Sequence, residues 1–224
     1  MKLYKFVKKE HLEAFFDRGS IRLSTIHEFR DVTAFGKSRQ DSKEGVHTLK
    51  RTVGKAPVSI TSKKKETLIS ESIRIQDPNL TIQFKGITFT NRYECEDALI
   101  FCSSHCFSED LFHRWHDTEG TDSCYEITDA LNFVKAINKK LKDSAYFALN
   151  SNILYIDEPA DYQSPLANVH PGIIKNKREY GWQVENRSVW FVKNPYAKLD
   201  GIIIEVPEAR EFSKPFSSFR MHSA

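Results

Sequence analysis

The sequence predicts a single α+β domain whose core is a mixed, largely antiparallel β-sheet with a few helices. Candidate strands outnumber candidate helices, and most of them follow one another directly instead of alternating with helices. Size and composition agree, because 224 residues with 40% hydrophobic residues and 16 phenylalanines can bury one substantial core. We therefore expect residues 1–224 to form one domain.

The first thirty residues are expected to form a strand, a helix and a second strand. Residues 2–7 alternate in the way typical of a strand, and residues 10–18 carry a leucine and two phenylalanines at helical spacing. Gly19 stands where a left-handed residue commonly ends a helix. The extended pattern then resumes over residues 21–25.

Residues 36–66 are expected to form a basic loop or insertion within the domain. The segment is rich in Ser, Thr, Lys and Gly and has no sustained apolar face, so we expect it to be peripheral and mobile. Nine lysines and arginines against three acidic residues give it a local net charge of +6. Such a run is commonly a solvated surface, but it also suits phosphate binding. The candidate nucleic-acid-binding residues are Lys50, Arg51, Lys63, Lys64 and Lys65.

The remainder of the chain is rich in strand patterns. Residues 68–76 and 80–90 alternate and are separated by a turn-forming Asp-Pro-Asn, so they are expected to pair as a hairpin. Residues 129–142 are expected to form an amphipathic helix with Asp129 as its N-cap. Further strands are expected at residues 98–104, 123–128, 152–157, 188–193 and 201–206.

Charge and hydropathy limit the function classes. A formal net charge of +3 does not by itself indicate a polyanion partner, so the argument for one rests on local charge. The N-terminal residues 1–16 carry scattered charges and no signal-peptide core, and no apolar run approaches the length of a membrane span. We expect a soluble cytoplasmic protein that does not enter a membrane.

The four cysteines lie in one central stretch that also holds three histidines. Zinc sites prefer close ligand pairs, and the spacings here do not match a zinc-finger pattern. A cysteine inside an apolar strand pattern is more often a small buried hydrophobe than a ligand. We therefore predict no metal site and, given the absence of an export signal, no disulfides. The residues are Cys95, Cys102, His105, Cys106, His113, His116 and Cys124.

Residues 178–191 combine two tryptophans with a polar row formed by Gln183, Glu185 and Arg187. In an extended chain residues two apart share one face, so these three side chains would lie together. One interpretation is an edge strand with a solvated face, on which Glu185 and Arg187 form an ion pair of small value. The other is a catalytic carboxylate with a positioned amide beside it.

Four segments together resemble two related groups of proteins. Residues 3–25 resemble the first strand, helix and second strand of ADP-ribosyltransferase folds. Residues 3–6, 24–31, 102–115 and 182–187 also resemble a broad bacterial family of unassigned domains associated with phage-defence loci, including abortive-infection and toxin–antitoxin systems. The resemblance spans most of the chain, and it implies a split β-sheet of ADP-ribosyltransferase type with NAD as cosubstrate.

The resemblance also implies a set of site residues. Transferases of the arginine-serine-glutamate type bring together a basic residue on the first strand, serines on a middle strand and a Gln-x-Glu pair late in the chain. In this sequence Lys5 stands where the family has Arg or His, and Cys-Ser-Ser replaces Ser-Thr-Ser. The implied catalytic residues are Lys5, Gln183 and Glu185. The implied NAD-binding residues are Tyr4, Lys5, Ser24, Thr25, Phe29, Ser103, Ser104 and Trp115.

These residue types suit the chemistry. Breaking the bond between nicotinamide and ribose develops positive charge on the sugar, which a carboxylate at Glu185 would stabilise and orient. Gln183 would position the acceptor nucleophile. The serines could hold the second ribose, and the aromatic side chains could stack on the nicotinamide ring.

Two functions from other classes stay open. The first is a nucleic-acid-binding module or nuclease that uses the basic loop and the segment His113–Asp117, where Trp115 could stack on a base. The second is a catalytically silent interaction protein. For the transferase, the implied acceptor is nucleic acid, with a protein side chain as the other possibility. A toxin of this kind would need a neutralising antitoxin partner or a triggered state.

Overall fold

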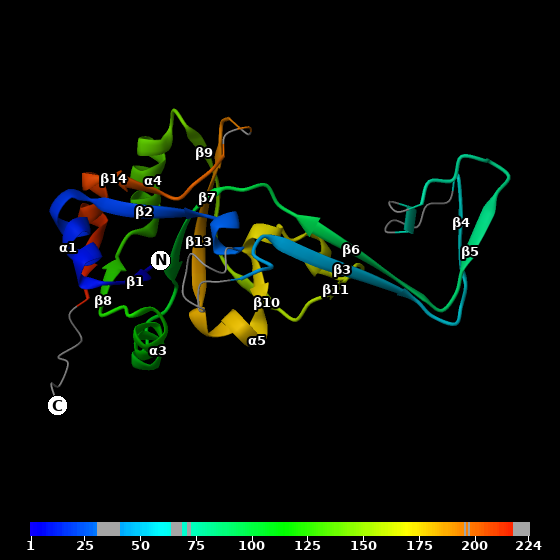
Figure 1. Cartoon of the computed structure of the whole chain (residues 1–224), viewed down its shortest axis with the longest axis horizontal. Coiled ribbons are helices and arrows are strands. Elements are labelled where there is room, and N and C mark those ends of the chain that lie inside the picture. Colours follow the sequence, from blue (N-terminus) through cyan, green and yellow to red (C-terminus); the bar gives the residue numbers. More distant parts are fainter. Residues whose placement is uncertain (31–40, 64–68, 71–72, 195, 197, 217–224) are drawn as a thin grey trace.

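The computed structural model describes residues 1–30, 41–63, 69–70, 73–194, 196 and 198–216. It confirms a mixed α+β fold whose sheets are mostly antiparallel and whose helices are few. The molecule consists of a body, which contains both the first strands and the late strands, and a long arm that projects from it (Figure 1). The arm is formed by the described residues within 46–94. Within the described residues, no helix is both long and apolar enough to span a bilayer.

The body is built on an eight-stranded sheet in which β14, β2, β7, β1, β8 and β15 lie in that order. Strand β7 has two edges: β1 and β2 pair with one, and β13 pairs with the other. β13 pairs in turn with β9. All these pairings are antiparallel. The strands are β1 (Leu3–Val7), β2 (Ser20–Thr25), β7 (Leu99–Ser104), β8 (Ser123–Ile127), β9 (Ala145–Asn152), β13 (Glu185–Val192), β14 (Ile202–Glu205) and β15 (Ser213–Pro215).

One edge of β7 is shared by two strands that separate from each other. β2 pairs with the start of β7 through Ser24–Ile100 and Thr25–Leu99. β1 pairs with the other end of β7 at Tyr4–Ser104. No described strand pairs with β7 on this edge between the two contacts, at residues 101–103. The sheet is therefore open along that stretch, with α1 (Lys9–Arg18) connecting the two strands that border the opening.

Helix α1 ends as its sequence predicts. Gly19 adopts a left-handed conformation with φ of 74°, and its N–H bonds to the carbonyl oxygens of Ala14 and Phe15. A Cβ at this position would lie 2.4 Å from the backbone of Val206, so a larger residue is excluded by space as well as by conformation. On the inner face of the helix, the Phe15 ring stacks on Tyr125 at 4.5 Å.

Two further helices cover the body. α4 (Ala130–Leu141) follows Asp129, whose side chain accepts a hydrogen bond from the Asn132 N–H, so the predicted N-cap is confirmed. Its apolar residues pack with Trp190 and Phe101 in the main core. α3 (Glu109–Glu119) was not predicted, although Ser108 caps it by accepting from the Leu111 N–H. The short helix α5 (Lys177–Tyr180) precedes β13.

Of the two alternatives predicted for residues 36–66, a basic loop or an insertion, the structure corrects the loop where it describes this segment. The described part of that segment contains β3 (Val46–Val53) and β4 (Val58–Thr61). β3 pairs along its whole length with β6 (Ile87–Glu94) and buries Val46, Leu49 and Val53. Residues 36–40 and 64–66 lie outside the described residues. The described part of the segment therefore contributes strands to a folded β-ribbon. The pattern does not stand out in the sequence because the alternating apolar residues of β3 lie among polar and basic neighbours.

The predicted hairpin of residues 68–76 with 80–90 is also wrong. Residues 69–70 are helical and residues 73–76 form no strand, while residues 68, 71 and 72 lie outside the described residues. The second half of the predicted hairpin forms β5 (Thr81–Phe84) and β6, which pair instead with β4 and β3. Near the body, β11 (Ala160–Asp161) adds a parallel strand to β3. The remaining strands β10 (Leu154–Ile156) and β12 (Ile174–Asn176) form a parallel pair beside β13.

Short 3₁₀ turns connect several of these elements. The first, η1 (His27–Arg30), follows β2 directly, and the others lie around β12 and β13 or before β15. These are η2 (Pro165–Asn168), η3 (Pro171–Ile173), η4 (Gly181–Gln183) and η5 (Pro207–Phe212).

Candidate active site

A cavity of about 530 Å³ lies at the opening of the sheet, bordered by β1, β2, β7 and α1 on one side and by the start of β13 on the other. Its volume is in the range of small-molecule sites. Most residues that the sequence singled out for catalysis or NAD binding line it. They are Tyr4, Lys5, Ser24, Phe29, Ser103, Ser104, Trp115, Gln183 and Glu185.

Thr25 is the predicted NAD-binding residue that does not line the cavity. Its side chain is buried, and its hydroxyl accepts a hydrogen bond from the Glu28 N–H at 2.9 Å. The Thr25 N–H in turn donates to the Glu28 carboxylate at 3.1 Å. Thr25 therefore begins the η1 turn, and the prediction that it contacts NAD has no support from this geometry.

Lys5 occupies the opening of the sheet. Its Nζ donates to the carbonyl oxygen of Cys102 at 2.5 Å and lies 4.8 Å from the centre of the Phe101 ring. The Cys102 carbonyl belongs to the part of β7 that has no strand partner on this edge. A buried carbonyl needs a donor, and the lysine ammonium supplies one where a neighbouring strand does not.

Strand register brings three of the predicted residues into one row. Ser104 lies opposite Tyr4 on β1 and opposite Glu185 on β13. Directly opposite residues of antiparallel strands share a face, so these three side chains project to the same side of the sheet. The Ser104 hydroxyl donates to the Gln183 carbonyl at 2.8 Å, and the Ser103 hydroxyl donates to the Asn186 carbonyl at 3.4 Å.

The predicted extended row from Gln183 to Arg187 is wrong at its first residue. Gln183 ends the η4 turn, and β13 begins only at Glu185. Between them Val184 has φ of 44° and ψ of 46°, a left-handed conformation that is rare and unfavourable for a β-branched residue. This local bend nevertheless brings the Gln183 amide and the Glu185 carboxylate to one partner, the ammonium of Lys175.

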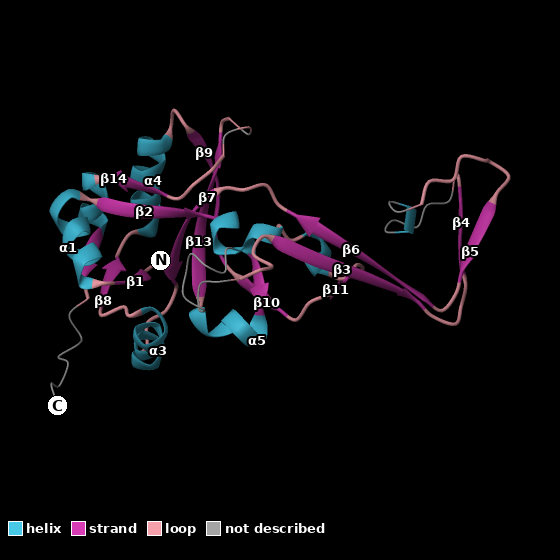
Figure 2. Cartoon of the chain, in the orientation of Figure 1, coloured by secondary structure: helices cyan, strands magenta, loops and turns pink. Residues whose placement is uncertain are grey.

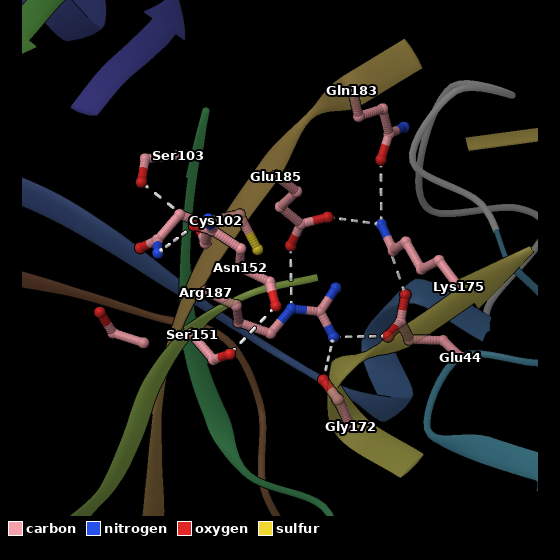
Figure 3. A network of polar contacts seen from close by, with 12 residues as sticks. Glu44, Cys102, Ser103, Ser151, Asn152, Gly172, Lys175, Gln183, Glu185 and Arg187 are labelled. Atoms are coloured by element: carbon pink, nitrogen blue, oxygen red, sulfur yellow. Dashed lines mark hydrogen bonds and ion pairs between the residues drawn. The ribbon is translucent and has the colours of Figure 1, made fainter. Parts of the chain in front are cut away.

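Glu185 belongs to a buried ion cluster, which we define as Glu44, Lys175, Glu185 and Arg187 (Figure 3). Its two carboxylate oxygens accept from Arg187 Nε at 2.9 Å and from Lys175 Nζ at 2.8 Å. Lys175 Nζ also donates to the Gln183 side-chain oxygen at 3.1 Å and lies 3.6 Å from Glu44. Arg187 Nη1 donates to Glu44 at 2.6 Å and to the Gly172 carbonyl at 2.7 Å.

The cluster also corrects the interpretation of an edge strand with a solvated face. β13 lies between β7 and β9, and Arg187 is completely buried. Two carboxylates and two cations balance, so the cluster carries no net charge. Two buried atoms in it, Arg187 Nη2 and Glu44 Oε2, have no hydrogen-bond partner among the described residues.

Burial alone would raise the pKa of Glu185, but attraction to Arg187 and Lys175 outweighs it and holds the pKa well below the usual range. Burial would likewise lower the pKa of Lys175, and attraction to Glu185 and Glu44 reverses the direction. Both side chains are therefore charged at neutral pH. The Glu185 backbone is fixed as well, because its N–H donates to the Tyr155 hydroxyl at 2.9 Å.

Sequence reasoning missed Lys175 and Glu44. Lys175 stands in a segment with two other basic residues, and Glu44 stands in the segment interpreted as a solvated basic loop. Neither position has a local pattern that marks it as buried. The only signal was Arg187, two residues after Glu185, which shows that the carboxylate has a cation within reach.

Aromatic side chains form the wall of the cavity near α3. The ring centre of Trp115 lies 6.4 Å from that of Phe6, in a stacked arrangement, and 4.8 Å from that of Trp182. The guanidinium of Arg114 lies 4.3 Å from the Trp182 ring. Trp115 is thus half-buried between neighbours and faces the cavity from the same helix that carries His113 and Asp117.

The alternative nuclease segment lies on α3. His113, His116 and Asp117 are exposed on this helix, and His116 Nδ1 lies 3.3 Å from the Asp117 carboxylate. Within the described residues no three His, Cys, Asp or Glu side chains are arranged to hold a metal ion.

The candidate nucleic-acid residues lie on the arm, away from the cavity. Lys50 and Lys63 are exposed, whereas Arg51 is half-buried and donates to the Gln163 side chain at 2.8 Å. Lys64 and Lys65 lie outside the described residues.

The cysteines are all free thiols, and three of them are shielded. Burial raises the pKa of Cys95 to about 11, and that of Cys102 and Cys124 to about 12. Because the thiolate is the reactive form, a maleimide at neutral pH is expected to label the exposed Cys106 alone in the folded protein. Intact-mass measurement checks this, and rapid labelling of a Cys106→Ser variant would contradict it.

Comparison with known proteins finds no matching family model, no match among curated proteins and no match among solved structures.

Proposed function

We propose that the chain is an NAD-dependent ADP-ribosyltransferase whose active site is the cavity at the opening of the sheet. One observation carries the proposal: Lys5 on β1, the serines of β7 and the Gln183–Glu185 pair line one cavity although they are far apart in the sequence. The order matches that of arginine-serine-glutamate transferases. The opening between β1 and β2 along β7 supports an ADP-ribosyltransferase-like split sheet as the finer fold assignment.

In this proposal the C1′–N bond to nicotinamide breaks, and nicotinamide leaves with the bonding electrons. The acceptor nucleophile forms the new bond to C1′ and gives up its proton to solvent water. The carboxylate of Glu185 stabilises the positive charge on the ribose, and a carboxylate held in place by two cations needs no reorganisation as the charge develops. The amide of Gln183, fixed by Lys175, positions the acceptor.

The other end of NAD is expected to lie toward α1 and β2. Lys8 and Arg22 line the cavity there and can offset the charge of the diphosphate. Trp115 and Tyr4 offer aromatic surface for the nicotinamide ring.

The acceptor is a nucleic acid or a protein side chain. As a cytoplasmic toxin of a defence locus, the transferase would be restrained by a neutralising partner.

The direct test is incubation with NAD labelled in its adenylate phosphate, together with RNA, DNA or protein from a cell lysate. We expect the label to become covalently attached to one acceptor and free nicotinamide to appear in equal amount. If no acceptor class takes label and no nicotinamide is released, the transferase assignment fails. Strand cleavage without NAD would instead favour the nuclease alternative.

Lys5→Met is expected to weaken NAD binding by about tenfold, the effect of losing one charged hydrogen-bond donor. Methionine keeps most of the stem against Phe101 but removes the ammonium in the cavity. Titration calorimetry with NAD measures the change, and Lys5→Arg, which keeps the positive charge, serves as the control. Unchanged NAD affinity in Lys5→Met would remove this residue from the site.

A further inference from the structure

The β3–β6 ribbon has two chemically different faces. Cross-strand register places Thr48 opposite Arg92, Lys50 opposite Thr90, and Thr52 opposite Thr88. Opposite residues and residues two apart along a strand share a face, so these side chains form one continuous surface. All of them are exposed except Thr48, which is half-buried. We call this surface the ribbon face: Thr48, Lys50, Thr52, Thr88, Thr90 and Arg92. The next registered pair, Val46 and Glu94, continues the same face, but Val46 is buried and the Glu94 carboxylate pairs with Arg30.

The opposite face of the ribbon is occupied by packing. Leu49 packs in a buried cluster with Ile156 and Ile174, and Val53 packs in another with Ile60 and Ile69 at the far end of the arm. Arg51 also belongs to this side, where it donates to Gln163. The ribbon face is thus the side left for a partner, and it projects from the body with the rest of the arm (Figure 2).

Positive charge is concentrated on the arm. Residues 46–94 contain nine Lys and Arg against four Asp and Glu, a net charge of +5. The rest of the chain contains 24 Lys and Arg against 26 Asp and Glu, a net charge of −2. Within the described part of the chain, no carboxylate forms an ion pair with Lys50 or Arg92. Asp161 lies opposite Lys50 on β11, but its carboxylate accepts from the Gln163 N–H.

We propose that the ribbon face binds the phosphate backbone of a nucleic acid. This inference rests on the proposed function, in which the nucleic acid bound by the arm is the acceptor of the ADP-ribosyl group. Lysine, arginine and threonine are the side chains that contact phosphates and sugars without reading sequence. An eight-residue strand spans about 27 Å, and a two-stranded ribbon fits the major groove of duplex DNA. An anionic membrane is a poorer partner, because membrane-surface binding requires apolar side chains that this face lacks.

The test compares two double variants with the same change in net charge. Lys50→Gln/Arg92→Gln removes both cations of the ribbon face, whereas Lys139→Gln/Lys140→Gln removes two exposed lysines of α4 on the body. Binding is measured by fluorescence anisotropy without NAD, with labelled single-stranded RNA, duplex RNA, single-stranded DNA and duplex DNA, over a series of salt concentrations. Vesicles containing anionic lipid are the additional probe.

We expect the ribbon variant to bind its preferred nucleic acid on the order of tenfold more weakly, with a log–log salt slope shallower by about 1.8 for a duplex. The body variant should bind like the wild type. Equal weakening in both variants, or binding to vesicles but to no nucleic acid, would overturn the proposal. Because binding is measured without NAD, the two proposals can fail separately. A wild-type protein that binds no nucleic acid but transfers label to protein refutes the ribbon proposal alone, whereas a wild-type protein that binds nucleic acid but transfers no label refutes the transferase alone.

Discussion

Glu185→Gln is expected to lower ADP-ribosyl transfer by about two to three orders of magnitude, the scale of losing one preorganised electrostatic group. Glutamine keeps the shape and can accept from one of the two cations through its amide oxygen, but its NH2 group cannot accept from the other, and the negative charge that would face the ribose is removed. The measurement is NAD-dependent label transfer under saturating NAD. Wild-type transfer in a folded Glu185→Gln protein would remove Glu185 from catalysis.

The same substitution also affects stability, more than sequence reasoning predicts. An exposed ion pair would contribute less than about 1 kcal/mol. Glu185 instead bonds to two buried cations, and removing one partner of a buried ion pair costs about 3–5 kcal/mol. Transfer must therefore be compared among variants of similar stability, at a temperature well below their unfolding transitions.

Glu44→Gln is the matched control. Glu44 is completely buried, contacts the same Lys175 and Arg187, and is not among the residues that line the cavity. The substitution removes the same charge from the same cluster, so we expect a comparable loss of stability with transfer reduced much less than in Glu185→Gln. Equal losses of transfer in both variants would mean that the carboxylate acts only through the integrity of the cluster.

The sequence predicted the parts of the fold that depend on local pattern. Alternation identified β1 and β2, an apolar run identified β7, the left-handed Gly19 marked the end of α1, and Asp129 marked the start of α4. These features are set by neighbouring residues along the chain, so they can be recognised without knowing the tertiary structure.

Features that depend on distant contacts could not be predicted in this way. Glu44 has the local sequence of a solvated loop, and it is buried only because Arg187 and Lys175 lie beside it in the folded chain. The left-handed Val184 has no sequence signal either, since β-branched residues disfavour that conformation. The convergence of Gln183 and Glu185 on Lys175 therefore follows from a bend that the alternating pattern did not indicate.

Arg187→Met is expected to destabilise the protein by about 3–5 kcal/mol, because it leaves a buried cluster with two carboxylates and one cation. The Gly172 carbonyl loses its donor as well. Urea unfolding at neutral pH measures the change. The double variant Arg187→Met/Glu44→Gln restores the charge balance of the cluster, so it should be less destabilised than the sum of the two single variants.

The pH dependence of the unfolding free energy distinguishes the loss of the Arg187 charge from a simple packing defect. In the wild type the depressed pKa of Glu185 contributes stability that is present above its unfolded pKa of about 4.3 and is lost as pH falls below it. In Arg187→Met burial is opposed by Lys175 alone, so the pKa of Glu185 rises and its protonation at acid pH relieves the unpaired charge. The difference in unfolding free energy between the two proteins should therefore shrink as the pH is lowered below about 4.3, where the wild type loses the contribution of Glu185 and the variant, with its less depressed pKa, loses less. A difference that stays constant over this range would mean that Arg187 stabilises the fold by packing rather than by its charge.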